Sequence, residues 1–209
     1  MRSRALMTLL AAGALATLLV GCGAMKRSLY AGDGRDEWQK PDEVVALLGL
    51  SIGDKVADIG AGGGYFTFRL ADAVGAEGRV FAVDVDDEMI SFIREKATEE
   101  GYEQIEGVRG EFGDPKLPDG EVDLVFTCNT YHHIQDRAAY FARVLDDLVP
   151  NGRVAIVDYG ASGGWFTSWF DHNTPKETIV EEMGEAGYSL THDYDLLEKQ
   201  TLLVIEPKS

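Results

Sequence analysis

The chain has 209 residues, 45% of them hydrophobic, and a formal net charge of −17 at pH 7. This length and apolar content suffice for one compact domain, and the excess of acidic side chains disfavours nucleic acids and anionic lipid surfaces as partners. Cys22 and Cys128 are the only cysteines, which is too few for a cysteine-based zinc cluster.

The N-terminus has the pattern of a secretion signal. A positively charged start precedes an apolar run from Ala5 to Val20, which is short for a membrane span. The segment Leu19-Val20-Gly21-Cys22 resembles the lipobox of bacterial lipoproteins. The resemblance implies a signal peptide over residues 1–21, a lipidated Cys22 and, because Gly23 follows, a location on the periplasmic face of the outer membrane. An uncleaved membrane anchor and a cytoplasmic location are the alternatives.

Strands and helices alternate after a polar linker at residues 22–37, beginning with a helix at Pro41–Leu50. Apolar and β-branched runs predict strands at Lys55–Ile59, Arg79–Val85, Ile105–Arg109, Val122–Cys128, Arg153–Tyr159, Ser189–Tyr194 and Thr201–Glu206. Pro150, Asn151 and Gly152 predict a turn before the fifth strand. Amphipathic patterns predict helices at Tyr65–Val74, Asp87–Glu100, Arg137–Leu148 and Pro175–Ala186. This order predicts an α/β fold over residues 38–209, with a doubly wound, mostly parallel seven-stranded sheet that ends in an antiparallel hairpin.

A glycine-rich turn follows the first predicted strand, with the spacing Asp58-x-Gly60-x-Gly62-x-Gly64. Glycines permit positive φ and the close approach of a ligand, and the following helix offers free N–H groups and the positive end of its dipole. The turn therefore predicts a site for an anionic or zwitterionic small molecule. Tyr65 occupies the position of the third glycine in the dinucleotide fingerprint, which argues against NAD.

The residues just past the other strands are the next candidates, because open parallel sheets bind ligands at the carboxyl ends of their strands. Asp84 ends the second strand, about twenty residues after the turn, where a carboxylate accepts hydrogen bonds from ribose hydroxyls. The segment Glu111–Asp114 places an aromatic side chain beside acids, which suits an adenine. The fourth strand leads into Cys128–His133, and Asp158 and Tyr159 end the fifth.

Together these segments resemble the class I S-adenosylmethionine-dependent methyltransferases over most of the chain from Trp38 onward. The matching segments are Val56–Gly64, Arg79–Asp84, Gly113–Asp114, Asp123–Asn129 and Arg143–Arg153. The resemblance implies a Rossmann-like methyltransferase domain at residues 38–209 with S-adenosylmethionine as its cofactor. By this resemblance, Asp58 and the glycines Gly60, Gly62 and Gly64 contact the methionine end of the cofactor. Asp84 binds the ribose, and Asp114 binds the adenine amine. The sulfonium lies near the peptide of Cys128 and Asn129.

The methyl acceptor leaves little trace in a sequence, because displacement at a sulfonium needs an aligned nucleophile more than a set of catalytic groups. His132 and His133 are the candidates for a general base. Alternatively, one packs under the sheet edge and the other bonds to backbone. We predict no metal site, since adjacent histidines at a strand end point in opposite directions. Cysteine-rich metalloid methyltransferases are disfavoured, because Cys128 alone remains if Cys22 is lipidated.

Two further segments border the predicted site. The aromatic pairs in Trp165–Phe170 suit a short helix packed on the sheet, a substrate lid or a membrane contact, and the polar residues 171–173 follow them. Near the N-terminus, Tyr30, Arg35 and Trp38 either close the cofactor site or act as linker and packing residues.

These observations predict a lipid-anchored class I methyltransferase that acts on a small molecule or, secondarily, on a protein side chain. Its partners are then the acceptor and, through Cys22, the membrane. The cofactor is made in the cytoplasm whereas the lipobox directs export, so a non-catalytic periplasmic protein that binds an adenosine-like or cationic ligand is an alternative. A polyamine-synthase-like propylamine transferase shares the fold, but Asn129 and Thr130 stand where its acid pair is expected.

Overall fold

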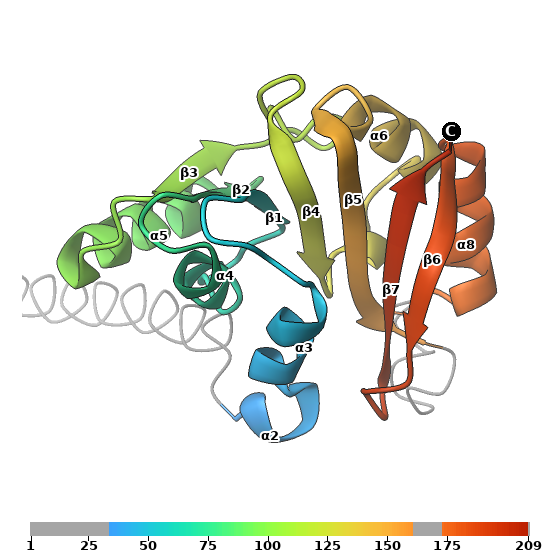
Figure 1. Ribbon diagram of the computed structural model, residues 1–209, viewed down its shortest axis with the longest axis horizontal. Helices are drawn as coiled ribbons and strands as arrows, with labels where there is room; N and C mark the ends of the chain where they lie inside the picture. The colour runs from blue at the N-terminus through green and yellow to red at the C-terminus, as the bar shows by residue number, and fades with distance from the viewer. Residues whose placement is uncertain (1–33, 161–172, 209) are drawn as a thin grey trace, which may run out of the picture.

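The computed structural model describes residues 34–160 and 173–208 (Figure 1). The predicted signal peptide with Cys22, Tyr30, the aromatic segment Trp165–Phe170 and the two residues after it lie outside these ranges. Helix α2 (Asp36–Gln39) begins within the range predicted as a linker, and α3 (Pro41–Leu47) follows it. No helix of the described ranges is both long enough and apolar enough to cross a bilayer.

A seven-stranded sheet with the order β3-β2-β1-β4-β5-β7-β6 forms the centre of the domain (Figure 1). The strands are β1 (Lys55–Ile59), β2 (Arg79–Asp84), β3 (Ile105–Arg109), β4 (Val122–Cys128), β5 (Leu148–Tyr159), β6 (Tyr188–Tyr194) and β7 (Gln200–Pro207). The first five strands pair in parallel, and β7 pairs antiparallel with both β5 and β6. The predicted α/β fold with an antiparallel C-terminal hairpin is confirmed.

Helices cover both faces of the sheet. They are α4 (Thr67–Val74), α5 (Asp87–Glu100), α6 (Arg137–Val144) and α8 (Lys176–Glu185), together with α3. Side chains alternate along β1, so Ala57 and Ile59 share a hydrophobic cluster with residues of α6 and α8, whereas Val56 shares one with residues of α3 and α4. Because both faces of β1 and β4 are buried, ligands reach these strands only at their ends.

One helix and one strand depart from their predicted boundaries by four or five residues, whereas the other elements differ by at most three. The helix predicted to reach Leu148 ends at Val144, and β5 begins at Leu148, before the predicted turn. Val122 pairs with Leu148 and Leu124 with Arg153, so the intervening residues of β5 bulge out of the ladder. The bulge contains Pro150, which has no N–H to donate to a ladder. The turn signal therefore marks a break in strand pairing within β5 rather than a turn before the strand begins.

Asp147 is a fully buried carboxylate just before β5. Among the described residues, neither of its side-chain oxygens has a hydrogen-bond partner, although Arg143 Nη1 lies 3.4 Å from Oδ1. Burial raises the pKa of Asp147 from 3.8 to about 6, against the opposing effect of the Arg143 charge. The ionised side chain therefore opposes folding at neutral pH.

Asp147→Asn should stabilise the protein at neutral pH. The folded state binds the Asp147 proton more tightly than the unfolded state does. The free energy of unfolding therefore falls as the pH rises from the unfolded pKa of 3.8 to the folded pKa of about 6. Above that pH, the full cost of burying the ionised carboxylate remains. Asparagine removes the buried charge but also the ion pair with Arg143. We expect the free energy of unfolding to rise by about 1 kcal/mol at about pH 7.5 and to be unchanged at about pH 4.

Urea denaturation at both pH values measures this effect. Asp146→Asn is the matched control, because Asp146 lies 3.6 Å from the same Arg143 but its side chain is 75% exposed. Equal stabilisation in the two variants would mean that burial of Asp147 is not the cause.

Candidate active site

A cavity of about 430 Å³ lies at the carboxyl ends of the central strands. Its wall is formed by the glycine turn after β1, the end of β2, the loops after β3 and β4, and Arg35 ahead of α2. A larger hollow of about 930 Å³ lies at the amino ends of the strands, beside Lys55, Arg79 and Glu121. Because parallel sheets bind ligands at the carboxyl ends of their strands, the smaller cavity is the candidate site.

The glycine turn lines this cavity through Gly60 and Gly62, whose φ angles are 76° and 54°. A Cβ atom at Gly60 would lie 2.1 Å from Thr130 Oγ1, so glycine is needed there both for its φ angle and for the close approach of the loop after β4. Gly64 is not among the lining residues, and a Cβ there would lie 2.6 Å from the Phe68 ring. The predicted glycine cradle therefore consists of Gly60 and Gly62, while Gly64 makes room for α4.

Asp84 lines the cavity at the end of β2. Its Oδ2 accepts a 2.9 Å hydrogen bond from the Gly62 backbone N–H, and its Oδ1 accepts one of 2.9 Å from the backbone N–H of Asp86. These two bonds hold the carboxylate beside the glycine turn. Each oxygen keeps a further lone pair that can accept a hydrogen bond from a ligand hydroxyl.

Asp58 lies in the same wall and is only 3% exposed. Burial raises the pKa of Asp58 from 3.8 to about 6, although the hydrogen bond from Thr67 Oγ1, 2.6 Å from Oδ2, lowers it. The negative charge of Asp84 raises the pKa further, and the positive charge of Arg35 lowers it. Asp58 is therefore ionised at neutral pH and becomes protonated in mild acid.

The acid predicted to contact an adenine lies elsewhere. Asp114 is absent from the cavity wall, and its carboxylate accepts hydrogen bonds from the Lys116 backbone N–H at 2.8 Å and from Lys116 Nζ at 3.0 Å. The lining residues of this loop are Glu111 and Phe112, and Phe112 is 70% exposed. A tight turn, in which the Glu111 N–H donates to the Asp114 carbonyl at 2.8 Å, gives the two acids different surroundings. Glu111 therefore replaces Asp114 as the candidate adenine contact.

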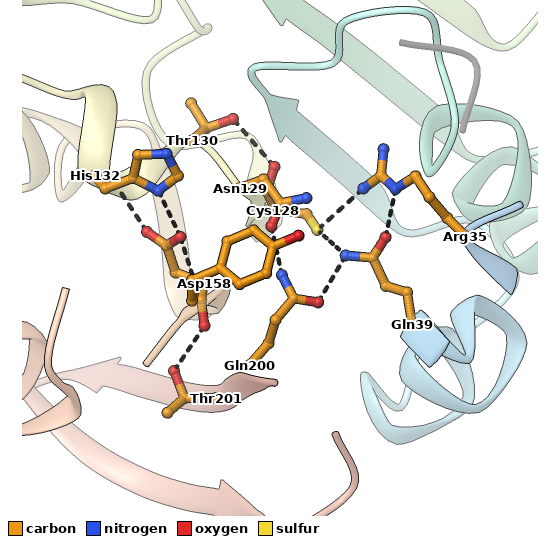
Figure 2. Close-up of polar contacts among 10 residues, drawn as sticks. Arg35, Gln39, Cys128, Asn129, Thr130, His132, Asp158, Gln200 and Thr201 are labelled. Atoms are coloured by element: carbon orange, nitrogen blue, oxygen red, sulfur yellow. Dashed lines mark hydrogen bonds and ion pairs between the residues drawn. The ribbon is translucent and has the colours of Figure 1, made fainter. Parts of the chain in front are cut away.

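Cys128 and Asn129 line the cavity, and a chain of hydrogen bonds connects them to α2 and β7 (Figure 2). The buried Gln39 donates from Nε2 to Gln200 Oε1 at 2.8 Å and to Cys128 Sγ at 3.0 Å. Gln200 Nε2 in turn donates to Asn129 Oδ1. Burial raises the pKa of the Cys128 thiol far above its ordinary value, so Cys128 is a neutral wall residue and not a nucleophile.

The two histidines of the 3₁₀ turn η1 (Tyr131–His133) have different surroundings. His132 Nδ1 lies 2.6 Å from Asp158 Oδ1, and the His132 backbone N–H donates to Asp158 Oδ2 at 2.9 Å (Figure 2). Both side chains are almost completely buried, at 5% and 0% exposure. His133 lines the cavity, and its ring centroid lies 4.1 Å from that of His132. His133 is therefore the histidine that can reach a ligand, whereas His132 and Asp158 hold the turn.

The N-terminal helix contributes to the site more than the sequence indicated. Arg35 lines the cavity, and Trp38 stacks on Tyr159 with 6.2 Å between ring centroids. Gln39 and Gln200 were not predicted as site residues, because no local pattern marks them and they meet only when α2 packs against the strand ends. Within the described ranges, His, Cys, Asp and Glu side chains form no group of three or more that could hold a metal ion.

Comparisons with known proteins show what this domain is similar to. Residues 56–152 match the family described as "Methyltransferase domain". An arsenite methyltransferase of Halobacterium salinarum is 36% identical over 117 residues, which are 54% of this chain and 29% of that protein. Phosphoethanolamine N-methyltransferase 1 of Triticum aestivum is 30% identical over 164 residues, which are 78% of this chain and 30% of that protein. A SAM-dependent methyltransferase from Aquifex aeolicus shares the fold with a TM-score of 0.80 and 23% identity, over 88% of this chain and 98% of that one.

The matched family and the named relatives are methyltransferases, and the Aquifex aeolicus structure shows that the fold is shared. The chain spans only 29% and 30% of the lengths of the two curated relatives named above. The substrates named for them therefore describe those proteins.

Proposed function

We propose that the protein transfers a methyl group from S-adenosylmethionine to a small-molecule acceptor. The supporting observation is that the glycine turn, Asp84 and the pair Glu111–Phe112 all line one cavity of about 430 Å³. A cavity of this size suits a nucleoside with a short side chain.

The residues of the cavity suit each part of that cofactor. Gly60 and Gly62 present backbone without side chains to the methionine end, and the ionised Asp58 complements its ammonium group. Asp84 is held in place to accept hydrogen bonds from the ribose hydroxyls. The exposed ring of Phe112 offers a stacking face to adenine beside Glu111.

The reaction requires orientation more than acid–base chemistry. The bound cofactor supplies an electrophilic methyl group, and the acceptor must lie in line with the breaking bond. Cys128 and Asn129, whose side chains accept hydrogen bonds from Gln39 and Gln200, form the wall beside the transferred methyl. His133, which lines the cavity, is the candidate to take a proton from an acceptor that must lose one.

A small molecule is the acceptor that the chain supports best. Arsenite and phosphoethanolamine, named for two relatives, are both small molecules. A net charge of −17 disfavours nucleic acids as acceptors. With two cysteines in the whole sequence, the chain is poorly equipped to hold arsenite through thiolates.

Isothermal titration calorimetry with S-adenosylmethionine and S-adenosylhomocysteine tests the cofactor assignment. We expect saturable binding of both, and formation of S-adenosylhomocysteine when S-adenosylmethionine is supplied with a panel of amine, thiol and hydroxyl acceptors. Absence of binding at millimolar concentrations would reject the proposed function. Binding without turnover of any acceptor would favour the non-catalytic binding protein.

Affinity for S-adenosylhomocysteine should fall in mild acid. The ammonium group of this ligand is attracted to ionised Asp58, whose pKa of about 6 means that most of its charge is lost well below that value. We expect about tenfold weaker binding at about pH 5 than at about pH 7.5, measured by calorimetry. Asp58→Asn should bind weakly at both pH values and lose most of this dependence. An unchanged pH dependence in that variant would show that another group is responsible.

We also propose that the chain is a lipoprotein anchored through Cys22. The proposal rests on the charged start, the apolar run and the Leu-Val-Gly-Cys segment that ends it. Intact-mass analysis of protein purified from a bacterial host should show loss of residues 1–21 and acylation of Cys22, and Cys22→Ser should abolish both. A full-length chain recovered from the cytosol would contradict anchoring.

A further inference from the structure

Arg35 is the only lysine or arginine in the wall of the cavity, as far as the described residues go. The other ionisable lining groups include the acids Asp58, Asp84 and Glu111. In a chain with a net charge of −17, a guanidinium at this place adds a positive charge that attracts anions.

The Arg35 side chain is held from two sides. Its Nε donates to Gln39 Oε1 at 2.7 Å, and Gln39 is fully buried and bonded in turn to Gln200 and Cys128 (Figure 2). The guanidinium carbon lies 4.4 Å from the centroid of the Tyr65 ring, within the range of a cation–π contact. A guanidinium fixed in this way loses little conformational entropy when it binds a ligand.

Among the described residues, few groups are placed to bind the remaining donors of Arg35. No carboxylate of the described residues forms an ion pair with Arg35, and Nη2 makes only a 3.9 Å contact with Cys128 Sγ. Arg69, which lies over the same Tyr65 ring at 4.5 Å, is instead paired with Asp36 and Asp42, each at 3.2 Å. Two arginines thus share one ring, but only Arg35 lines the cavity and has donors available for an external anion.

We propose that Arg35 binds the carboxylate of the methionine part of S-adenosylmethionine. Arg35 contacts Cys128 at the end of β4, and its charge acts on Asp58 at the end of β1, so it lies where the proposed function places the methionine end. Asp58 and Arg35 then match the two charges of the zwitterion, the ammonium and the carboxylate respectively. This pairing selects the intact cofactor over its decarboxylated form, which is the donor in propylamine transfer, and so favours methyl transfer.

The inference rests on the proposed function. It is tested by comparing wild-type protein and an Arg35 variant in their affinity for ligands with and without the carboxylate. Calorimetry with Arg35→Met should show roughly 10- to 100-fold weaker binding of S-adenosylhomocysteine. Binding of 5′-methylthioadenosine, which lacks the amino acid group, should change less than about twofold. Wild-type protein should bind S-adenosylmethionine at least about tenfold more tightly than decarboxylated S-adenosylmethionine, and Arg35→Met should remove most of that preference.

Arg69→Met is the matched control, because it removes a cation from the same ring without touching the cavity, and it should keep the wild-type preference. Equal losses for S-adenosylhomocysteine and methylthioadenosine would overturn the inference, since they would show a structural effect of Arg35. Unchanged affinity for S-adenosylhomocysteine in Arg35→Met would also overturn it. Failure of the wild-type protein to bind S-adenosylhomocysteine would instead reject the proposed function.

Discussion

Replacing Asp84 by alanine should weaken S-adenosylmethionine binding by at least about 100-fold, the largest loss expected for one side chain of this site. Two charge-assisted hydrogen bonds to ribose hydroxyls are worth roughly 1.5 to 3 kcal/mol each, and about 1.4 kcal/mol corresponds to a tenfold change in affinity. The same carboxylate also receives the Gly62 and Asp86 N–H groups, so its loss loosens the glycine turn. Calorimetry with S-adenosylmethionine and with methylthioadenosine measures the effect, and both ligands should be affected because both carry the ribose.

Asp87→Ala is the control for this experiment. Asp87 lies three residues further along the chain, outside the cavity wall, with a side chain 81% exposed and paired with Arg109 at 2.7 Å. Its replacement should change the affinity less than about twofold, since an exposed ion pair contributes little. If Asp84→Ala bound S-adenosylmethionine with wild-type affinity, the proposed contact between Asp84 and the ribose would be wrong. The proposed orientation of the cofactor would then be wrong as well.

Gly60→Ala should abolish detectable cofactor binding and lower the free energy of unfolding by about 3 kcal/mol. The φ angle of 76° is strained for alanine, and the new methyl group would lie 2.1 Å from Thr130 Oγ1 and 2.4 Å from its Cγ2. The turn and the loop after β4 cannot both keep their positions, so the wall shared by Gly60 and Thr130 must open. Thermal unfolding and calorimetry on the same preparation record the two effects.

A second substitution separates the overlap from the backbone strain. Thr130→Gly in the Gly60→Ala background removes the atoms that the methyl group would meet and should restore part of the lost stability. Gly113→Ala is the matched control, because Gly113 lies in a neighbouring loop without a positive φ, and a Cβ atom added there would meet nothing within 4 Å. A stability loss in Gly113→Ala as large as that in Gly60→Ala would contradict the assigned cause.

The central strands β1 and β4 were predictable because their burial follows from short apolar segments. β1, β3 and β4 span the residues predicted for them, and the two C-terminal strands pair antiparallel as expected. Predictions failed where strand pairing overrides the local pattern, as at Leu148, which reads as the end of a helix but pairs with Val122. Local sequence cannot show this, because the partner strand lies more than a helix away along the chain.

The site was predictable only in part, for a similar reason. Spacing from the glycine turn located Asp84, which the structure holds against Gly62. The same reasoning located the loop after β3 but chose Asp114 over Glu111, because only the fold of that turn decides which acid lines the cavity. It also named two adjacent histidines without separating them, and the buried Asp158 at the end of β5 decides that His132 turns inward.

The sequence by itself determined the order of strands and helices, the glycine turn and the class of ligand that the turn accepts, because these depend on side-chain periodicity and on the conformational freedom of glycine. Only the tertiary structure decided what surrounds the methionine end. Gln39 and Gln200, 161 residues apart in the chain, meet in a 2.8 Å hydrogen bond and hold Arg35 at the cavity. Such contacts leave no local pattern, because hydrogen bonds between distant residues form only after the sheet and α2 have packed together.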